Sequence, residues 1–326
     1  MGVYVGAGAA TAEYALEASY GNGDTLDTAL DLVEESMREN TEPLRSGVFM
    51  GSRAHKTYHL GSKGASGDIK FIANPDNLPK ILYAALGTEA EEGQVDETTA
   101  YDHDFTPEAV GGDLPSLNVG IDKHGSEYGY PGLVINTITF EFTKGDYLYV
   151  TLGTLAQKEL DDQSGLQGVS LSTKLPYIGD YASLEIGGVA KTYGISGSIV
   201  INNFLDEEGS YRLTGDRFRS EPRPQTFMVT ANLEIEWESG SDALRDAIRD
   251  NTDTQVTIVV THETAIEAGY YYTLTIDIPT AKIIGELPVL STRDRIPFPL
   301  TIEGVYNVTN LVKVTHRDAL NAKWSA

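Results

Sequence analysis

The sequence contains no cysteine, few basic residues and no long apolar run. The absence of cysteine excludes disulfide bridges, thiol catalysis, zinc ribbons and cysteine-ligated iron–sulfur clusters. Only 24 Lys and Arg stand against 48 Asp and Glu, and the resulting net charge of −24 argues against a basic clamp on nucleic acid. No stretch approaches the ~18 apolar residues of a membrane span, and residues 1–22 lack a signal-peptide pattern. We therefore expect a soluble chain or assembly with no membrane partner.

The acidic excess has two interpretations. Abundant surface carboxylates keep a protein hydrated and dispersed in concentrated salt, where their mutual repulsion is screened. This interpretation predicts a halophilic source. The alternative is ordinary solubility.

Period-two alternation of apolar and polar residues dominates the chain and predicts a mainly β fold. The clearest strands are expected at Leu133–Phe142, Tyr147–Leu152, Ile195–Ile201, Phe227–Trp237, Gln255–Val260, Tyr271–Ile278 and Arg295–Ile302. Helical spacing is rare and predicts two short helices, at 78–86 and 244–249. A weaker pattern from Leu26 to Met37 carries many acids and is also compatible with a loop or an arm.

An ordered series of matches suggests that one β module occurs twice. Residues 69–82, a strand and the start of a helix, match residues 235–248 at a constant offset of 166 (235 − 69), and an alternating strand follows in each half. We therefore predict two similar β-sandwich modules, each with one short flanking α-helix, plus an extended N-terminal arm. The expected divisions are an arm at 1–44, module 1 at 45–157, a linker at 158–179, module 2 at 180–304 and a C-terminal segment at 305–326.

Two stretches contain few apolar residues for a core of their own. These are residues 1–44 and the acidic stretch Thr88–Gly112. We expect both to be mobile in a single chain and to become ordered by contacts with neighbouring chains.

No nucleotide or metal motif stands out. His55 and His59 have a metal-ligand spacing only on a helix, whereas a strand or loop is expected there. The run Gly61–Gly67 resembles a phosphate-binding loop, but no Gly-Lys-Ser/Thr follows it and no βαβ unit surrounds it. We expect a turn at this position, and no cofactor or metal site.

Catalytic carboxylates are equally poorly supported. Pairs such as Asp102/Asp104 and Glu234/Glu236 could be drawn as a glycosidase pair, but no cluster of sugar-stacking aromatic residues accompanies them. Solvated strand faces explain them better, and we predict no enzymatic activity. Asn307 begins an N-glycosylation triplet, a pattern that is frequent by chance.

Several blocks, each weak by itself, follow one another in a characteristic order. They are Gly67–Phe71, Leu78–Gly87, Tyr101–Pro107, Leu114–Val119, Tyr130–Phe140, Ser196–Asn203 and Arg219–Pro224. In this order, over roughly 45–305, the chain resembles the major tail (tail tube) proteins of long-tailed, siphovirus-like viruses. The unusual acidity suits a virus of a halophilic archaeal host.

The resemblance implies a structural protein of the virion tail, made in the host cytoplasm and stacked as rings around a DNA conduit. The implied partners are further copies of the chain, a tape-measure protein, tail-tip and tail-terminator proteins, and DNA that passes without specific binding. Because rings of this family have sixfold character, two modules per chain imply a trimeric, pseudo-hexameric ring. A hexamer of whole chains is the alternative. The rings are expected to stack through the arm and loops.

Two other classes of function remain open. One is a different virion component, such as a baseplate hub or a decoration protein. The other is a secreted carbohydrate-binding or carbohydrate-active β-protein or adhesin. That class is expected to have a signal peptide and clustered tryptophan, whereas the only tryptophans are Trp237 and Trp324.

Two alternating strands supply candidate residues for the lumen of a tube. The candidates are Thr137, Thr139 and Glu141 in the first strand and Thr273, Thr275 and Asp277 in the second. Each set alternates with apolar residues, so it forms one face of its strand. A barrel lined by such faces would be hydrated and negative, and it would let a polyanion slide. The alternative is that these faces point to outside solvent.

Overall fold

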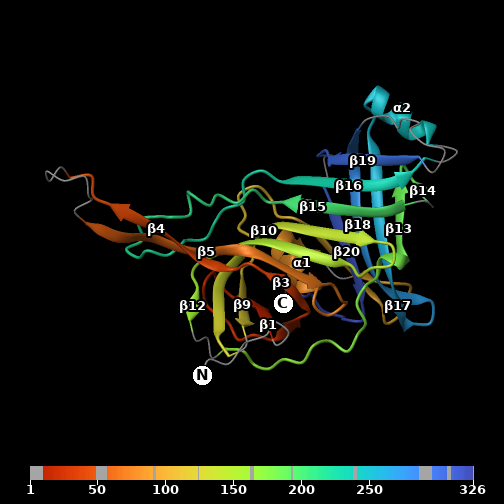
Figure 1. Ribbon diagram of the computed structural model, residues 1–326. Helices are drawn as coiled ribbons and strands as arrows, with labels where there is room; N and C mark the ends of the chain where they lie inside the picture. The colour runs from red at the N-terminus through yellow and green to blue at the C-terminus, as the bar shows by residue number, and fades with distance from the viewer. Residues whose placement is uncertain are drawn as a thin grey trace, which may run out of the picture.

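The computed structural model describes residues 10–48, 57–90, 93–123, 125–161, 165–191, 194–237, 241–285, 296–306 and 310–325. The fold is mainly antiparallel β structure (Figure 1), which confirms the predicted class. Two short α-helices, α1 (Pro79–Leu86) and α2 (Asp242–Asp250), lie where the helical spacing predicted them.

Strands account for most of the remaining elements. The first half contains β1 (Thr11–Leu16), β2 (Thr28–Leu30), β3 (Leu32–Glu35), β4 (Arg38–Arg45), β5 (Tyr58–Ile72), β6 (Gly87–Glu89), β7 (Gly93–Gln94), β8 (Tyr101–Pro107), β9 (Leu117–Asp122), β10 (Glu127–Thr143), β11 (Tyr149–Ala156) and β12 (Leu160–Asp161). The second half contains the 3₁₀-helix η2 (Gly179–Tyr181), β13 (Ala182–Ile186), β14 (Val189–Lys191), β15 (Gly194–Asn202), β16 (Met228–Glu236), β17 (Thr254–Glu267), β18 (Tyr270–Ile284), β19 (Pro297–Gly304) and β20 (Lys313–Asp318).

One long antiparallel sheet crosses both halves of the chain. Its strands follow in the order β5–β11–β10–β15–β16–β19, and they lie side by side in Figure 1. The junction between the halves is the pairing of β10 with β15, which runs from Thr137↔Asn202 to Thr143↔Ser196. The two halves therefore share hydrogen-bonded backbone.

A second sheet packs across the first. It runs β14–β13–β17–β18–β20–β8, with β6 and β7 on the far side of β8. Strand β18 belongs to both sheets, because Thr273–Asp277 pairs with β20 whereas Ala281–Ile284 pairs with β19. Strand β10 is shared in a similar way. Its first part pairs with β9, which also pairs with β1, and its second part lies in the long sheet.

One large core lies between the sheets, and a small second cluster contains Leu114, Val134, Leu155 and Leu205. Apolar residues alternate along each strand, and those of both halves, such as Phe71, Phe140, Ile199, Ile276 and Phe298, belong to one buried cluster. Burial of this apolar surface is the main contribution that stabilises such a sandwich.

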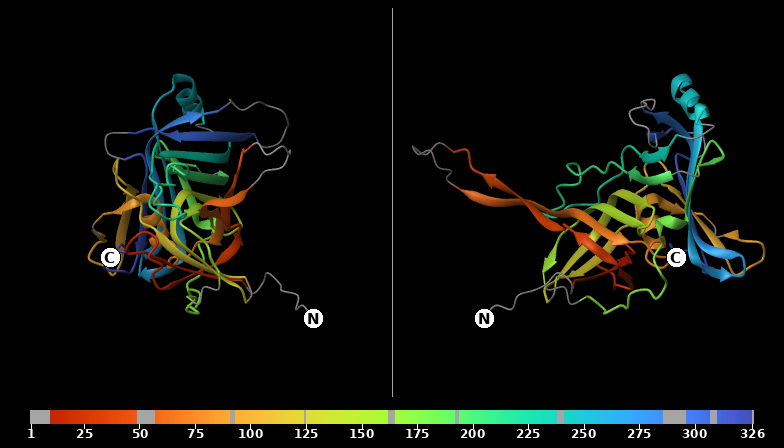
Figure 2. Two further views of the ribbon diagram at one scale, coloured as in Figure 1. Left: turned by 90° about the vertical axis from the view of Figure 1, so that its left-hand side faces the viewer. Right: turned by 45° about the vertical axis from the view of Figure 1, so that its right-hand side comes forward.

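The two helices differ in their surroundings, although their sequences occupy matching positions. Helix α1 is apolar and largely buried, and it ends at Gly87, whose φ of 92° suits glycine. Helix α2 alternates arginine with aspartate, and only Leu244 is buried. Figure 2 shows α2 at the rim of the molecule. The two halves therefore repeat the order of their elements along the chain, but their helices are buried to different extents.

Residues 10–45 form strands and differ in this from the expected mobile arm. Strand β1 pairs with β9 and β2, and its Tyr14 is buried and donates a hydrogen bond from Oη to the Asn77 carbonyl oxygen at 2.6 Å. Within the acidic stretch 88–112, β8 buries Phe105 in the core. Both stretches contribute strands to the sheets of one chain. A few apolar residues are enough to hold such a strand in place, because the rest of the chain supplies the core around it.

The predicted turn at Gly61–Gly67 is wrong, because β5 runs through it without interruption. Glycine is needed there for close packing: a Cβ atom on Gly67 would lie 2.6 Å from the Ser36 carbonyl oxygen. The first part of β5 pairs with β4, and the two strands form a hairpin that projects from the body (Figure 2).

Candidate functional site

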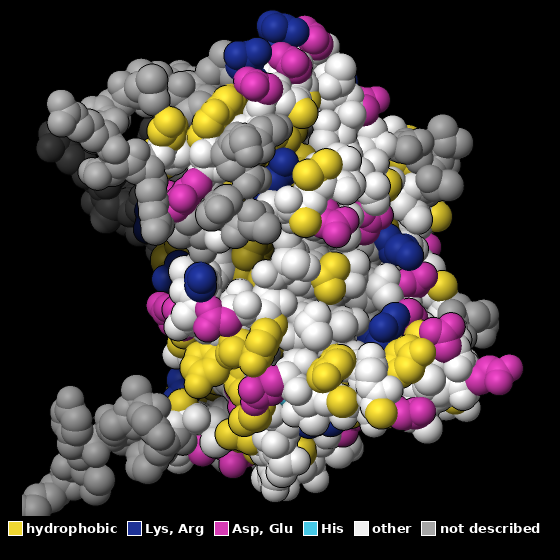
Figure 3. Space-filling model, turned by 90° about the vertical axis from the view of Figure 1, so that its right-hand side faces the viewer, with side chains coloured by type: hydrophobic (Ala, Val, Ile, Leu, Met, Phe, Trp, Pro, Cys, Tyr) yellow, Lys and Arg dark blue, Asp and Glu magenta, His cyan; other side chains and the backbone are white. Residues whose placement is uncertain are grey.

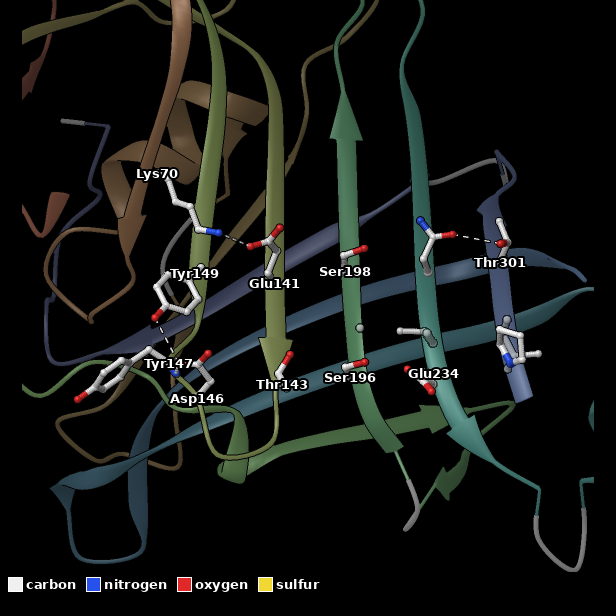
Figure 4. A pocket seen from close by; sticks show the side chains of 15 residues that line it. Lys70, Glu141, Thr143, Asp146, Tyr147, Tyr149, Ser196, Ser198, Glu234 and Thr301 are labelled. Atoms are coloured by element: carbon white, nitrogen blue, oxygen red, sulfur yellow. Dashed lines mark hydrogen bonds and ion pairs between the residues drawn. The ribbon is translucent and has the colours of Figure 1, made fainter. Parts of the chain in front are cut away.

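The outer face of the long sheet is polar on every strand. On β10, Thr137, Thr139 and Glu141 are partly exposed, whereas Ile138 and Phe140 are buried beneath the sheet. Serine, threonine, asparagine and glutamate side chains of β15, β16 and β19 continue this face beyond the junction of the two halves (Figure 4). We call it the long-sheet face.

A shallow groove of about 550 Å³ runs over the long-sheet face and is lined by residues of all six strands or their ends. Its lining includes three carboxylates, from Glu141, Asp146 and Glu234, and one ammonium group, from Lys70. The groove is therefore hydrated and carries excess negative charge at neutral pH.

Lys70 is held close to the acids around it. Its Nζ atom lies 2.7 Å from Glu141 Oε2 and 4.8 Å from the centre of the Tyr149 ring. The Tyr149 hydroxyl donates to Asp146 Oδ1 at 3.2 Å, and desolvation together with the Asp146 charge raises the pKa of Tyr149. These contacts restrict the one ammonium group of the groove (Figure 4), so it does not project as a free phosphate contact.

The second predicted set of residues lies elsewhere. Thr273, Thr275 and Asp277 sit on the part of β18 between β17 and β20, and Asp277 Oδ1 accepts hydrogen bonds from Thr257 and Gln255 at 2.7 and 2.8 Å. Their apolar neighbours belong to the same core that buries Phe140.

The two sets therefore point away from one core in opposite directions, and they are not equivalent as we expected. The period of a strand reports which residues alternate, but it does not report which sheet the strand joins. Whether either set lines a conduit stays a prediction.

Sequence reasoning missed a buried ionic cluster. His103 on β8 lies between two carboxylates, with Nδ1 3.0 Å from Glu89 Oε1 and Nε2 3.2 Å from Asp318 Oδ1. Burial alone lowers the pKa of His103, but its bonds to Asp318 and Glu89 outweigh burial and raise the pKa to about 10. In the same way His103 holds the pKa of both carboxyl groups below their ordinary values, against the effect of burial. We call these three side chains the His103 triad.

The triad fixes the end of the described chain. Trp324 donates from Nε1 to Asp318 Oδ2 at 2.8 Å, and the Ser325 backbone N–H donates to Glu89 Oε2 at 2.8 Å. His103 and His316 are direct partners across β8 and β20. The alternation of Val314, His316 and Asp318 on β20 was the available signal that these side chains face inward.

The described residues were also compared with what a metal site or a membrane-spanning helix requires. In these ranges no three His, Asp or Glu side chains are grouped so that they could hold a metal ion, and His59 is an exposed residue of β5. His55 and Asn307 lie outside the described residues. Among the described helices none is long and apolar enough to cross a membrane.

Comparison with known proteins identifies a family for this chain. The search of curated proteins returned no match to this chain. The sequence model of the family described as phage tail tube protein matches residues 9–302, which is most of the chain. The matched range includes every strand of the long sheet except the last residues of β19. The chain therefore belongs to the phage tail tube protein family, whose members are structural components of the virion tail.

Proposed function

We propose that this chain assembles into rings that stack as the tail tube, with the long-sheet face lining a conduit for viral DNA. The observation that carries the proposal is the continuity of this polar, acidic face across both halves of the chain. A wall of small hydroxyl groups and carboxylates offers DNA phosphates no cluster of cations, so the duplex can slide without binding.

The two halves act as two consecutive modules of the ring in this proposal. Strands β5–β11–β10 of residues 45–157 correspond in order to β16–β19–β18 of residues 180–304, with 158–179 as the linker. The pairing of β10 with β15 joins one module to the next within the chain. An analogous junction between chains would close the ring and cover the edges of the sheet.

The width of the conduit favours three chains per ring. From the β3–β4 edge to β18 each chain supplies eight strand positions. Strands ~4.8 Å apart and tilted by ~40° give three chains a backbone diameter of about 48 Å, and six chains about twice that. The smaller barrel suits one duplex, so we favour the trimeric, pseudo-hexameric ring over a hexamer.

The ring itself is the first test. We expect negative-stain microscopy of concentrated recombinant protein to show rings or tubules, and averaged end views to show three chains with sixfold pseudo-symmetry. Six equivalent subunits would replace the trimer by the hexamer. Particles without a central channel would contradict the proposed function.

The acidic composition supports a long-tailed virus of a halophilic archaeal host as the source. We expect the melting temperature of the assembly to fall as salt is reduced from about 1 M to about 0.1 M, because the screening length grows from about 3 to about 10 Å. A melting temperature independent of salt would remove the halophilic host and leave the tube proposal intact.

The other partners follow from the same role. We propose that the tube assembles in the host cytoplasm around a tape-measure protein, and that tail-tip and tail-terminator proteins cover its two ends. DNA passes through it without specific binding.

A further inference from the structure

A pocket of about 200 Å³ opens where the β10–β11 turn, the segment before β13 and strand β17 meet. Figure 3 looks at this end of the molecule and shows hydrophobic side chains gathered on it. The pocket lining is mainly apolar, and it includes two tyrosine rings and one carboxylate. The lining residues are Tyr147, Leu175, Pro176, Ile178, Tyr181, Thr261, His262 and Glu263. We call this site the tyrosine pocket.

Hydrogen bonds hold the walls of the tyrosine pocket in place. The Gly179 N–H donates to the Asp146 carbonyl oxygen at 2.8 Å, which ties the segment before β13 to the β10–β11 turn. His262 Nε2 donates to the Leu175 carbonyl oxygen at 2.7 Å, and His262 Nδ1 accepts from the Thr264 N–H at 2.9 Å. The pocket is therefore formed in the single chain, and both imidazole nitrogens are already occupied. Binding to such a preformed site costs little conformational entropy.

The groups that a ligand would meet at the tyrosine pocket are unpaired. Tyr147 and Tyr181 are 44% and 47% exposed, so their rings are open to solvent. The exposed Glu263 carboxylate has no ion pair or hydrogen bond with any described residue. No Lys or Arg belongs to the described lining. Two rings and a carboxylate thus share one pocket without a cation.

The same chain shows elsewhere what this combination of groups binds. Three lysines each lie over a tyrosine ring and also pair with a carboxylate. They are Lys70 with Tyr149 and Glu141, Lys123 with Tyr128 and Glu35, and Lys174 with Tyr272 and Asp76. Their ammonium nitrogens lie 4.8, 5.1 and 4.7 Å from the ring centres. The tyrosine pocket has the rings and the carboxylate but no lysine, so its lining favours a cation from outside the chain.

The apolar walls select the kind of cation. A primary ammonium or a guanidinium group carries several N–H donors, and burying them without acceptors costs free energy. The side chains of Leu175, Pro176 and Ile178 offer no acceptor. Inorganic cations require several oxygen ligands at once. A quaternary ammonium group has no N–H, and its methyl groups pack against aromatic faces and apolar walls.

We propose that the tyrosine pocket binds a small quaternary ammonium compound such as choline. The charged head contacts the rings of Tyr147 and Tyr181, and Glu263 supplies the opposite charge. The exposed carboxylates of Asp146 and Asp180 are next to the two tyrosines in the chain, so they repel a ligand with an anionic group near its head. The inference goes beyond the proposed function and does not rest on it, because a single chain carries every lining residue.

The charge of the ligand is tested on the wild-type chain. We titrate it with choline chloride at constant ionic strength and follow binding by ligand-observed NMR. We expect saturable binding in the millimolar range, and about tenfold weaker binding of the uncharged isostere, in which a tert-butyl group replaces the trimethylammonium head. Equal binding of choline and the isostere, or no saturable binding of choline, would overturn the proposal.

Two double variants test the aromatic rings. Tyr147→Leu with Tyr181→Leu keeps an apolar wall but removes both rings, so we expect the affinity for choline to fall about tenfold. Tyr147→Phe with Tyr181→Phe keeps the rings and is expected to bind choline within about twofold of the wild type. Because both side chains are half exposed, the melting temperatures should stay close to that of the wild type. Equal affinities of the two double variants would overturn the role of the rings.

A single variant tests the carboxylate. Glu263→Gln removes the opposite charge, and we expect the affinity for choline to fall about fivefold. Glu185→Gln is the matched control, because Glu185 is an exposed carboxylate of β13 outside the pocket lining. We expect the control to bind like the wild type. An equal loss in both variants would show a general attraction by the acidic surface and would overturn the assignment.

The same head group also occurs on lipids, where a phosphate is attached to it. Because carboxylates flank the tyrosine pocket, we expect phosphocholine to bind more weakly than choline and phosphatidylcholine vesicles not to co-sediment with the chain. Binding to the vesicles without a response to free choline would overturn the assignment to a small molecule.

Discussion

Replacing His103 with glutamine is expected to lower the free energy of unfolding by about 3–5 kcal/mol, because the change leaves two buried carboxylates without the cation between them. Glu89 and Asp318 lie 3.0 and 3.2 Å from the ring nitrogens of His103, and the His103 side chain is fully buried. The shift in the urea-unfolding midpoint at pH 7 measures this loss.

The matched control is His59→Gln on the exposed start of β5. An exposed substitution of this kind is expected to change stability by less than about 0.5 kcal/mol. Equal midpoints for the two variants would contradict the role of the His103 triad in fixing the C-terminal segment.

The His103 triad also sets a pH window for stability. The folded pKa of His103, about 10, lies above its ordinary value of 6.5, so its contribution is fully present below pH 6.5 and is lost as pH rises through 10. The pKa values of Glu89 and Asp318 are lowered, so their contribution is present above the ordinary values of 4.5 and 3.8 and is lost as pH falls through the lowered values. In melting curves recorded against pH, His103→Gln should lack the alkaline loss attributable to this group. Parallel curves for variant and wild type above pH 6.5 would contradict this assignment.

The second large effect concerns the passage of DNA. Changing Glu141 and Glu234 to lysine removes two negative charges and adds two positive charges per chain on the long-sheet face, where both side chains line the groove. Because ammonium groups bind phosphates and release counterions, we expect tubes to assemble but DNA ejection from variant virions to slow at least tenfold. The delay should shrink as salt is raised, since phosphate contacts weaken with salt.

The opposite face provides a control with the same change in charge. Glu185 and Asp277 flank Thr257 across β13, β17 and β18, on the polar side of the second sheet. Changing both to lysine is expected to leave ejection at the wild-type rate. Slow ejection in this control, together with normal ejection in the first variant, would indicate that the second sheet lines the conduit and would contradict the proposal for the long-sheet face.

Local pattern was sufficient to predict the class of fold, both α-helices and the most regularly alternating strands. The alternation in 133–142 and 271–278 predicted strands that the structure contains, and both helices lie where expected. It could do so because strand period and helical spacing depend on neighbours within a few residues. The alternation also separated the exposed Thr137, Thr139 and Glu141 from the buried side of β10.

Contacts between distant segments were not predictable in this way. His103 and Asp318 are 215 residues apart in the chain, and no local period relates them. Residues Thr273–Asp277 repeat the pattern of β10 yet lie on the opposite side of the core, because β18 passes from one sheet to the other. The glycines of β5 indicated a turn, although the close backbone of Ser36 explains why glycine is required in a strand there.

The proposal that the long-sheet face lines a DNA conduit is tested most directly by a cryo-electron microscopy map of tubes assembled from the purified chain, resolved well enough to place side chains. We predict that Thr137, Thr139, Glu141 and Glu234 face the tube axis, and that Thr273, Thr275 and Asp277 face away from it. A map in which the long-sheet face forms the outer surface of the tube, or in which the second sheet surrounds the channel, would contradict the proposal.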